Sequence, residues 1–283
     1  MKLVRFGPAG AERPGIVDVG GRVRDLSGIV SDIDAAVLGP DGLNRIAAVD
    51  PASLPLVDED VRFGPPVANT RQFLAIGLNF SDHAAESNLP VPAEPILFTK
   101  GVSCIQGCTD DVRKPRGSTK MDWEVELAIV IGTRARYVEK DKALDHVAGY
   151  MICDDLSERN FQNERGGSWD KGKGCETFGP LGPWLVTRDE VGDVQNLGMW
   201  LDVNGERMQT GNSATMIFDC ATIVSYVSQF IVLQPGDVIT TGTPPGVGMG
   251  MNPQRFLKEG DVIELGIEKL GVQRHKVIAW DAA

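Results

Sequence analysis

The sequence predicts a β-rich α+β fold, with a small N-terminal β domain at residues 1–66 and a larger domain at residues 67–283. The chain of 283 residues contains 33 Gly and 17 Pro, which indicates many turns. Short strand-like runs between these residues recur along the chain, and helical patterns are few. The length allows one large domain, or a small one beside a larger one, to bury a real core.

The N-terminal domain is expected to be structural. Three short runs separated by Gly and Pro predict strands: KLVRF, GIVDV and RVRDL. Residues 31–39 predict a helix with Ser31 as its N-cap, and residues 56–70 predict a linker because they are rich in Pro and small polar residues. The domain has no His, no Cys and no cluster of chemical groups. We expect it to cover the second domain or to form a dimer contact.

The second domain alternates predicted strands with a few helices. The Asn204-Gly205 pair predicts the turn of a hairpin over residues 199–212, and Ser81 could cap a short helix. The remaining predicted strands are residues 73–80, 95–100, 121–132, 147–155, 235–248 and 259–267, and the predicted helices are residues 81–88, 157–167 and 218–233.

Composition excludes several classes of function. The chain has 28 basic and 39 acidic residues, a net charge of −11, which argues against nucleic-acid binding. Its five cysteines are odd in number and lack CxxC spacing, as in a reduced cytosolic protein. The start lacks the apolar core of a signal peptide, and no apolar run is long enough to span a bilayer. We therefore expect a soluble, cytoplasmic protein with no nucleic-acid or membrane partner.

The stretch MDWEVELAIVIG, residues 121–132, places acids at every second position. On a strand, Asp122, Glu124 and Glu126 would share one face, and that face then continues with apolar Ala128 and Val130. Acids beside an apolar continuation repel one another, and burial increases that repulsion. A divalent cation would remove the conflict, because hard cations bind carboxylate oxygens.

A third ligand would have to come from another strand. Asp155, at the end of the apolar run GYMIC and just before a predicted helix, is the best candidate. Asp154 or Asp155 could instead cap that helix, and the EVE segment could be the exposed face of an edge strand. Spacing alone leaves a metal site and a solvated acidic face both open.

His83 and Glu86 form a second candidate pair. They lie three residues apart on the helix predicted at residues 81–88, so both project from one face. A carboxylate beside an imidazole orients the ring, as in a general base, although a surface His beside a surface Glu is the alternative. His146 and His275 lie in polar stretches and are expected on the surface.

Two further segments could contact an anionic substrate. Residues 169–183 predict a flexible Gly-rich loop that carries Lys171 and Lys173, and such loops often close over anions; Lys171 is expected to be solvated. In residues 241–248, glycines permit close backbone approach and Thr243 could bind a carboxylate. The chain has no Walker loop, nucleophile elbow or dinucleotide fingerprint.

Six segments, in order, resemble the fumarylacetoacetate hydrolase family and cover nearly all of residues 71–267. They are IGLNFSDHAAE, MDWEVELAIVIG, YMICDDLSERNFQ, KGKGCETFGPLGP, VNGERMQTGNSATMIF and LQPGDVITTGTPPGVG. The resemblance implies a mixed β-sandwich roll built around a divalent metal, usually Mg²⁺, with Mn²⁺ also possible. This chain departs in having Trp123 where many relatives have Tyr, and His275 where relatives often have Asn.

The resemblance also implies roles for individual residues. The implied metal ligands are Glu124, Glu126 and Asp155. The His83–Glu86 pair would activate water, on a helix that can act as a lid. Lys173 matches the family's active-site lysine, and Thr243 falls in its substrate-carboxylate motif.

Residues 157–190 and the N-terminal start further resemble bacterial hydrolases of 2,4-diketo-3-deoxy-L-rhamnonate and -fuconate. The implied reaction is metal-dependent hydrolysis of the C3–C4 bond of an acylpyruvate-type 2-oxo acid, giving pyruvate and a second acid such as lactate. The implied assembly is a homodimer. The alternatives are a lyase on the same scaffold (ureidoglycolate lyase, oxaloacetate decarboxylase or a 2-oxo-acid hydratase) and, more remotely, a non-enzymatic metal-stabilised binding module.

Overall fold

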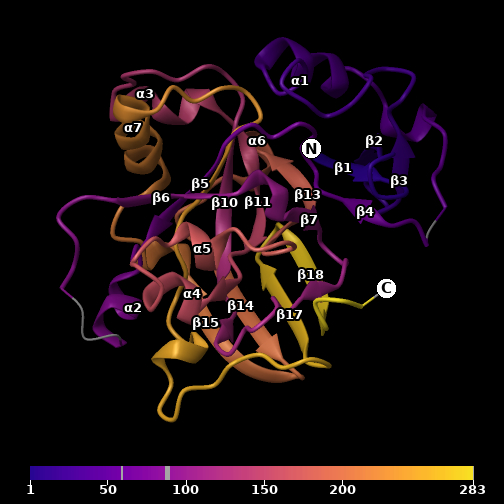
Figure 1. Cartoon of the computed structure of the whole chain (residues 1–283). Coiled ribbons are helices and arrows are strands. Elements are labelled where there is room, and N and C mark those ends of the chain that lie inside the picture. The colour runs from indigo at the N-terminus through magenta and orange to yellow at the C-terminus, as the bar shows by residue number, and fades with distance from the viewer. Residues whose placement is uncertain (59, 87–89, 283) are drawn as a thin grey trace.

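Two β-sheets face each other in the computed structural model, which describes residues 1–58, 60–86 and 90–282 (Figure 1). The larger sheet has the order β3-β2-β1-β13-β11-β10-β16-β5-β6, with β4 beside β1 and β7 beside β13. The bounds of its strands are β1 Lys2–Phe6, β2 Arg13–Val17, β3 Val23–Asp25, β4 Phe63–Gly64, β5 Phe73–Gly77, β6 Ile96–Lys100, β7 Ile105–Gly107, β10 Val125–Ile131, β11 Val147–Asp154, β13 Gly179–Thr187 and β16 Val238–Thr240.

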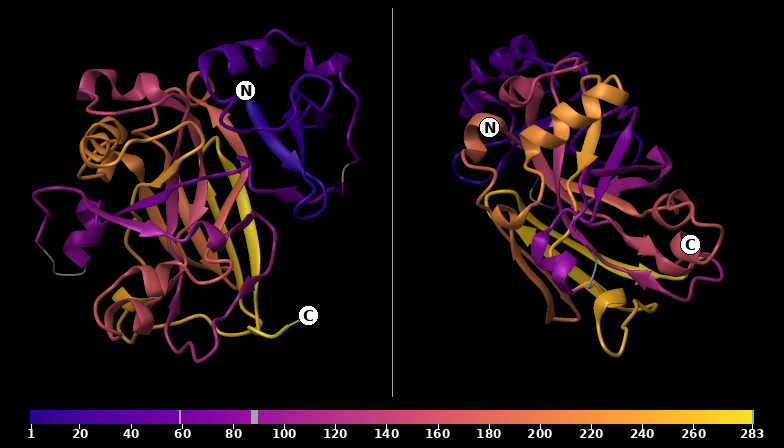
Figure 2. Two further views of the ribbon diagram at one scale, coloured as in Figure 1. Left: turned by 45° about the horizontal axis from the view of Figure 1, so that its top comes forward. Right: turned by 90° about the vertical axis from the view of Figure 1, so that its left-hand side faces the viewer.

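The smaller sheet has the order β15-β14-β17-β18-β8 and contacts β10, β11 and β13 through β14, β17 and β18 (Figure 2). Its strands are β8 Val112–Arg113, β14 Gly198–Val203, β15 Glu206–Asn212, β17 Val262–Ile267 and β18 Gly271–Ile278, and a separate pair joins β9 Met121–Asp122 to β12 Ser157–Glu158. The β-rich α+β class is thus confirmed, and the two facing sheets agree with the mixed β-sandwich roll that the resemblance implies.

Short helices connect the strands and cover the ends of the larger sheet (Figure 1). They are α1 Pro40–Ala47, α2 Ser81–Glu86, α3 Lys140–Ala143, α4 Arg159–Asn163, α5 Asp170–Lys173, α6 Arg188–Val191 and α7 Cys220–Phe230, with 3₁₀ turns at Pro51–Ser53, Val102–Cys104, Leu144–His146, Ser213–Thr215 and Gly248–Gly250. None of the helices in the described ranges is both long and apolar enough to cross a membrane.

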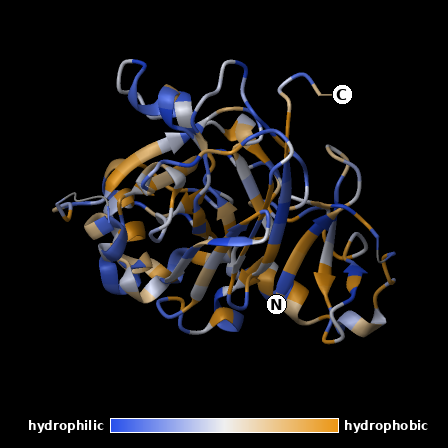
Figure 3. Ribbon diagram, turned by 90° about the horizontal axis from the view of Figure 1, so that it is seen from below, coloured by the Kyte–Doolittle hydropathy of each residue, from blue (hydrophilic) through white to orange (hydrophobic). Residues whose placement is uncertain are grey.

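The centre of the larger sheet explains the mixture of acids and apolar residues in the stretch at residues 121–132. Every residue of β10 and β11 is buried, and β10 has β11 on one side and β16 on the other. The interpretation of EVE as an exposed edge is therefore wrong. The apolar residues of β10 are buried in the hydrophobic core, and hydrophobic segments are frequent among the central strands of the ribbon (Figure 3).

The N-terminal strands continue the larger sheet. β1 pairs antiparallel with β13, with Leu3 opposite Leu185. β4 lies inside the predicted linker and pairs with β1, so the linker prediction is wrong at Phe63–Gly64. The domain boundary after residue 66 stays a prediction.

The helix predicted over residues 31–39 is wrong. Its apolar residues Ile33, Val37 and Leu38 are buried as a helical pattern would require, but turns carry them, and the carboxylate of Asp34 accepts a hydrogen bond from the Ala36 amide. Local side-chain bonds of this kind compete with helix formation. The helix begins instead at Pro40, a residue suited to the first helical position, and Ser31 is not its cap.

Two other local predictions are confirmed, the hairpin turn at Asn204-Gly205 and the helix over residues 218–233. Asn204 and Gly205 both have positive φ, 54° and 77°, as the tight hairpin turn between β14 and β15 requires. The long helix over residues 218–233 is α7, whose Asp219 cap accepts from Thr222. The Ser81 hydroxyl donates to the Thr215 carbonyl rather than capping α2, and predicted helix residues 87 and 88 lie outside the described residues. All five cysteines are free.

Candidate functional site

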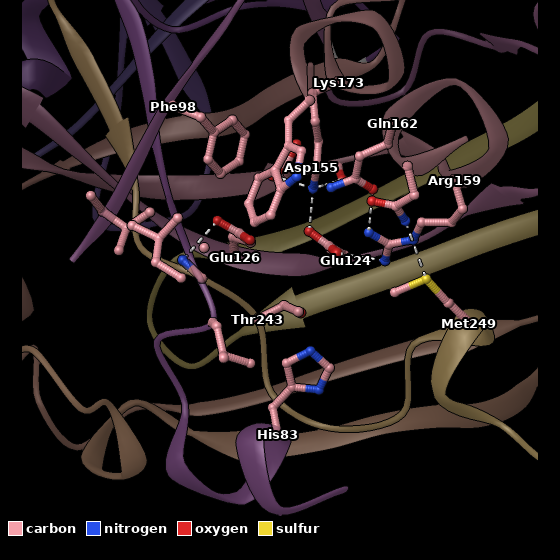
Figure 4. A pocket seen from close by; sticks show the side chains of 17 residues that line it. His83, Phe98, Glu124, Glu126, Asp155, Arg159, Gln162, Lys173, Thr243 and Met249 are labelled. Atoms are coloured by element: carbon pink, nitrogen blue, oxygen red, sulfur yellow. Dashed lines mark hydrogen bonds and ion pairs between the residues drawn. The ribbon is translucent and has the colours of Figure 1, made fainter. Parts of the chain in front are cut away.

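A cavity of about 260 Å³ opens at one end of the larger sheet, between α2, α4 and α5 (Figure 4). All seven residues that the sequence proposed for the site lie at or beside it. Six of them line it directly: His83, Glu124, Glu126, Asp155, Lys173 and Thr243. The seventh, Glu86, contacts His83.

Pairing of β10 with β11 brings the three carboxylates together. Val125 lies opposite Asp154, so Glu124 and Glu126, on either side of Val125, lie near Asp155 at the end of β11. The three side chains offer oxygens within 4.8 Å of one another, and each residue is at most 6% exposed. Three buried carboxylate oxygens are a donor set that fits a hard divalent cation.

Basic side chains already surround two of these acids. The Lys173 Nζ lies 2.6 Å from Glu124 Oε2 and 2.7 Å from Asp155 Oδ2. The Arg159 Nη2 lies 2.6 Å from Glu124 Oε1, and the Lys100 Nζ lies 2.5 Å from Asp155 Oδ1. Sequence reasoning missed Arg159 and Lys100; the acids alone signalled that buried partners had to exist.

Glu126 has a different environment. Burial raises its pKa well above the ordinary value, and the nearby Asp155 and Glu124 raise it further. Its carboxylate accepts from the Gly242 amide at 2.9 Å, and no Lys or Arg of the described ranges forms an ion pair with it. Burial would also raise the pKa of Glu124, but Lys173 and Arg159 lower it below its ordinary value. An added cation would therefore favour the ionised form of Glu126 more than that of Glu124, which already has basic partners.

His83 and Glu86 face each other as predicted. The His83 Nδ1 lies 3.2 Å from Glu86 Oε2, and the same carboxylate accepts from the Gly246 amide at 3.1 Å. His83 projects from α2 into the cavity, on the side away from Lys173 (Figure 4). Because Nδ1 is held by Glu86, Nε2 is the nitrogen with which His83 could accept a proton from a molecule in the cavity.

Two predictions about the anion-contacting segments need correction. Lys173 lies on helix α5 and is only 2% exposed, so it is not on a flexible open loop, whereas Lys171 is exposed as expected. The Thr243 hydroxyl donates to the Val125 carbonyl at 2.9 Å and accepts from Gln209. A substrate carboxylate would have to compete for that proton.

Asp122 and Asp154 lie outside the carboxylate cluster, as expected. Asp122 is fully buried and accepts from Arg159 Nε at 2.8 Å, from the Gly248 amide at 2.7 Å and from the Met249 amide at 3.0 Å. Asp154 accepts from the Glu124 amide, and burial raises its pKa to about 8.

The helix cap and one of the remaining histidines differ from expectation. Glu158 caps α4, so neither Asp154 nor Asp155 has that role. His275 is fully buried, which contradicts the surface prediction; it lies 3.0 Å from the Asp110 carbonyl and from Gln273 Oε1. Period-two alternation in β18 directs it inward despite its polar neighbours. His146 is partly exposed.

The chain resembles known proteins over nearly its whole length. A Burkholderia cenocepacia protein named only as a hydrolase is 56% identical over 274 residues, covering 96% of this chain and 97% of the relative. A fumarylacetoacetate hydrolase structure from Exiguobacterium antarcticum matches with a TM-score of 0.89 and 35% identity, covering 99% of both chains.

A maleylpyruvate hydrolase structure from Sphingobium, in complex with manganese(II) and pyruvate, matches with a TM-score of 0.83 and 28% identity, covering 99% of both chains. Other matching structures carry the names of isomerases. The model of the fumarylacetoacetate hydrolase C-terminal domain matches residues 72–278, and the carboxylate cluster and the His83–Glu86 pair both lie within that range. The chain therefore belongs to the fumarylacetoacetate hydrolase family of enzymes.

Proposed function

We propose that the protein hydrolyses the C3–C4 bond of a 2,4-diketo acid of the acylpyruvate type, giving pyruvate and a second carboxylic acid. The observation that carries the proposal is that Glu124, Glu126 and Asp155 converge in the same cavity as the His83–Glu86 pair. The three carboxylates would hold Mg²⁺, or alternatively Mn²⁺, which supplies a Lewis acid for the oxygens of a 2-oxo acid. The structural likeness to a hydrolase that binds manganese and pyruvate supports this assignment.

The His83–Glu86 pair would supply the nucleophile. Glu86 fixes the ring orientation through Nδ1, so Nε2 takes a proton from water as the water oxygen attacks the C4 carbonyl. A positioned base of this kind contributes a rate factor of about 10²–10⁴. The Gly246 amide holds Glu86 at the same time, which keeps the pair in place over the cavity.

Lys173 would stabilise the leaving group. When the C3–C4 bond breaks, its electron pair passes to C3 and gives the enolate of pyruvate. The Lys173 ammonium lines the cavity and is 2% exposed, so its charge acts with little screening on the oxygen that becomes negative. Protonation at C3 completes the reaction: one water is consumed, and pyruvate and the carboxylic acid from the C4 side are released.

The remaining cavity wall supports a short acyl group with an apolar end. Apolar residues form most of this wall, and they are Ile76, Leu78, Ile96, Phe98, Trp169 and Met249. Gln162 and Asn163, which carry side-chain amides, also line it. The rhamnonate- or fuconate-derived 2,4-diketo-3-deoxy acid, our finer proposal, ends in a methyl group beside one hydroxyl. The wall could receive the methyl, an amide could bind the hydroxyl, and lactate would be the second product.

A substrate panel tests this function. Simple acylpyruvates and 2,4-diketo-3-deoxy sugar acids would be incubated with the protein, with and without a chelator, and both products quantified by chromatography. Equal amounts of pyruvate and the second acid, lost with chelator, are expected. Release of carbon dioxide, or formation of an isomer, without the second acid would instead assign a decarboxylase or an isomerase.

A further inference from the structure

Lys100 is a fully buried cation that the proposed chemistry does not use. It ends strand β6 beside Phe73 of β5, and its side chain has 0% exposure. It does not line the cavity that the described residues form, so it reaches the carboxylate cluster from the protein interior and would not touch a substrate.

Three oxygens surround the Lys100 ammonium. Its Nζ lies 2.5 Å from Asp155 Oδ1, 2.6 Å from the Lys173 carbonyl and 3.4 Å from the Leu156 carbonyl. An ammonium group has three protons, so these acceptors can satisfy all of them. The Lys100 ammonium therefore joins the side chain of Asp155 to the main chain at Leu156 and at Lys173.

The two oxygens of Asp155 have separate partners. Lys100 binds Oδ1 from the interior, whereas Lys173 binds Oδ2 from the cavity side. The carboxylate thus cannot rotate without breaking the contact with Lys100, and Oδ2 stays beside the Lys173 ammonium, which also binds Glu124. Groups that hold a ligand side chain in this way commonly change metal affinity by a factor of about 10–100 when they are removed.

We propose that Lys100 is a positioning residue, which holds Asp155 in the orientation for binding a divalent cation and places the main chain of Lys173 at the same time. The inference rests on the proposed function only in taking Asp155 as a metal ligand. Lys100 acts through Asp155, so its removal should weaken the affinity for the cation more than the turnover of the loaded enzyme.

The test is Mn²⁺ binding to the substrate-free protein, measured by calorimetry and by the electron paramagnetic resonance signal of free Mn²⁺. Lys100→Met should raise the Mn²⁺ dissociation constant about 10–100-fold, and this change should exceed any fall in kcat measured at saturating Mn²⁺. Lys171→Met is the matched control. Lys171 lies on the same helix α5 as Lys173, and its exposed ammonium donates only to the Arg165 carbonyl among the described residues, so its removal should leave the constant unchanged.

Lys100→Gln serves as the second variant in case Lys100→Met does not fold, because it keeps a hydrogen-bond donor without the charge. Thermal melting without metal identifies which variant is folded. A folded Lys100 variant with the wild-type Mn²⁺ constant would overturn the inference and leave the proposed function standing. Wild-type protein that binds no Mn²⁺ would overturn the proposed function itself.

Discussion

Replacing Asp122 with Asn should destabilise the protein strongly, although Asp122 is not among the proposed metal ligands. The carboxylate Oδ2 accepts from Arg159 Nε at 2.8 Å and from the Met249 amide at 3.0 Å. The substituted side chain can keep one acceptor oxygen for the Trp123 and Gly248 amides, but its NH₂ group then faces the Arg159 and Met249 donors.

The magnitude follows from the burial. Asp122 is 0% exposed, so water cannot replace the lost bonds. Two hydrogen bonds to a charged group are worth about 1.5–3 kcal/mol each, and removing one partner from a buried ion pair costs about 3–5 kcal/mol. The Asp122→Asn variant should therefore lose about 4 kcal/mol of unfolding free energy.

The assay is equilibrium unfolding in guanidinium chloride near pH 7. Exposed Asp111 provides the control, because Asp111→Asn should change the unfolding free energy by less than about 0.5 kcal/mol. A loss below about 1 kcal/mol for Asp122→Asn would refute the reasoning, since it would mean that the carboxylate does not hold Arg159 and the Met249 amide in solution.

Three other changes test separate parts of the site and fold. His83→Ala should lower kcat by a factor of about 10²–10⁴ and leave Mn²⁺ affinity nearly intact in calorimetry; parallel loss of both would argue against a base role. Glu124→Ala should lose Mn²⁺ binding and pyruvate release together, and an active variant without metal would contradict the ligand assignment. Burial lowers the pKa of His275 to about 4, so the unfolded chain binds the extra proton between about pH 4 and 6.5, and stability falls as pH falls through that window, by up to about 3 kcal/mol. The unfolding free energies of wild type and His275→Gln would be measured across this pH range, and the difference between them should rise with pH. A difference that does not change with pH would show that His275 does not resist protonation in the folded state.

Local chemistry makes several features predictable from sequence. Asn204-Gly205 specifies its hairpin because both residues tolerate positive φ, and the alternation around Glu124 specifies which side chains share a face. The likeness of six segments to one family supplies candidates for the site residues that the spacing alone leaves open.

The features that sequence reasoning missed depend on contacts between distant segments. Lys100 reads as the polar end of a strand, and only the arrival of Asp155 beside it, 55 residues later, explains its burial. Polar neighbours favour a surface position for His275, although every second residue of β18 points inward. The turns at residues 31–39 bury apolar residues at helical spacing, so hydrophobic periodicity could not distinguish them from a helix.

The pairing of β1 with β13 constrains how the chain could be shortened. A protein that starts after residue 66 would leave the amide and carbonyl groups around Leu185 and Val186 without their neighbour. Unpaired strand edges of this kind can pair with strands from other molecules. We therefore expect a truncated protein to self-associate, even with its carboxylates and imidazole unchanged. In the full chain, β1 covers this edge of β13 by pairing with it.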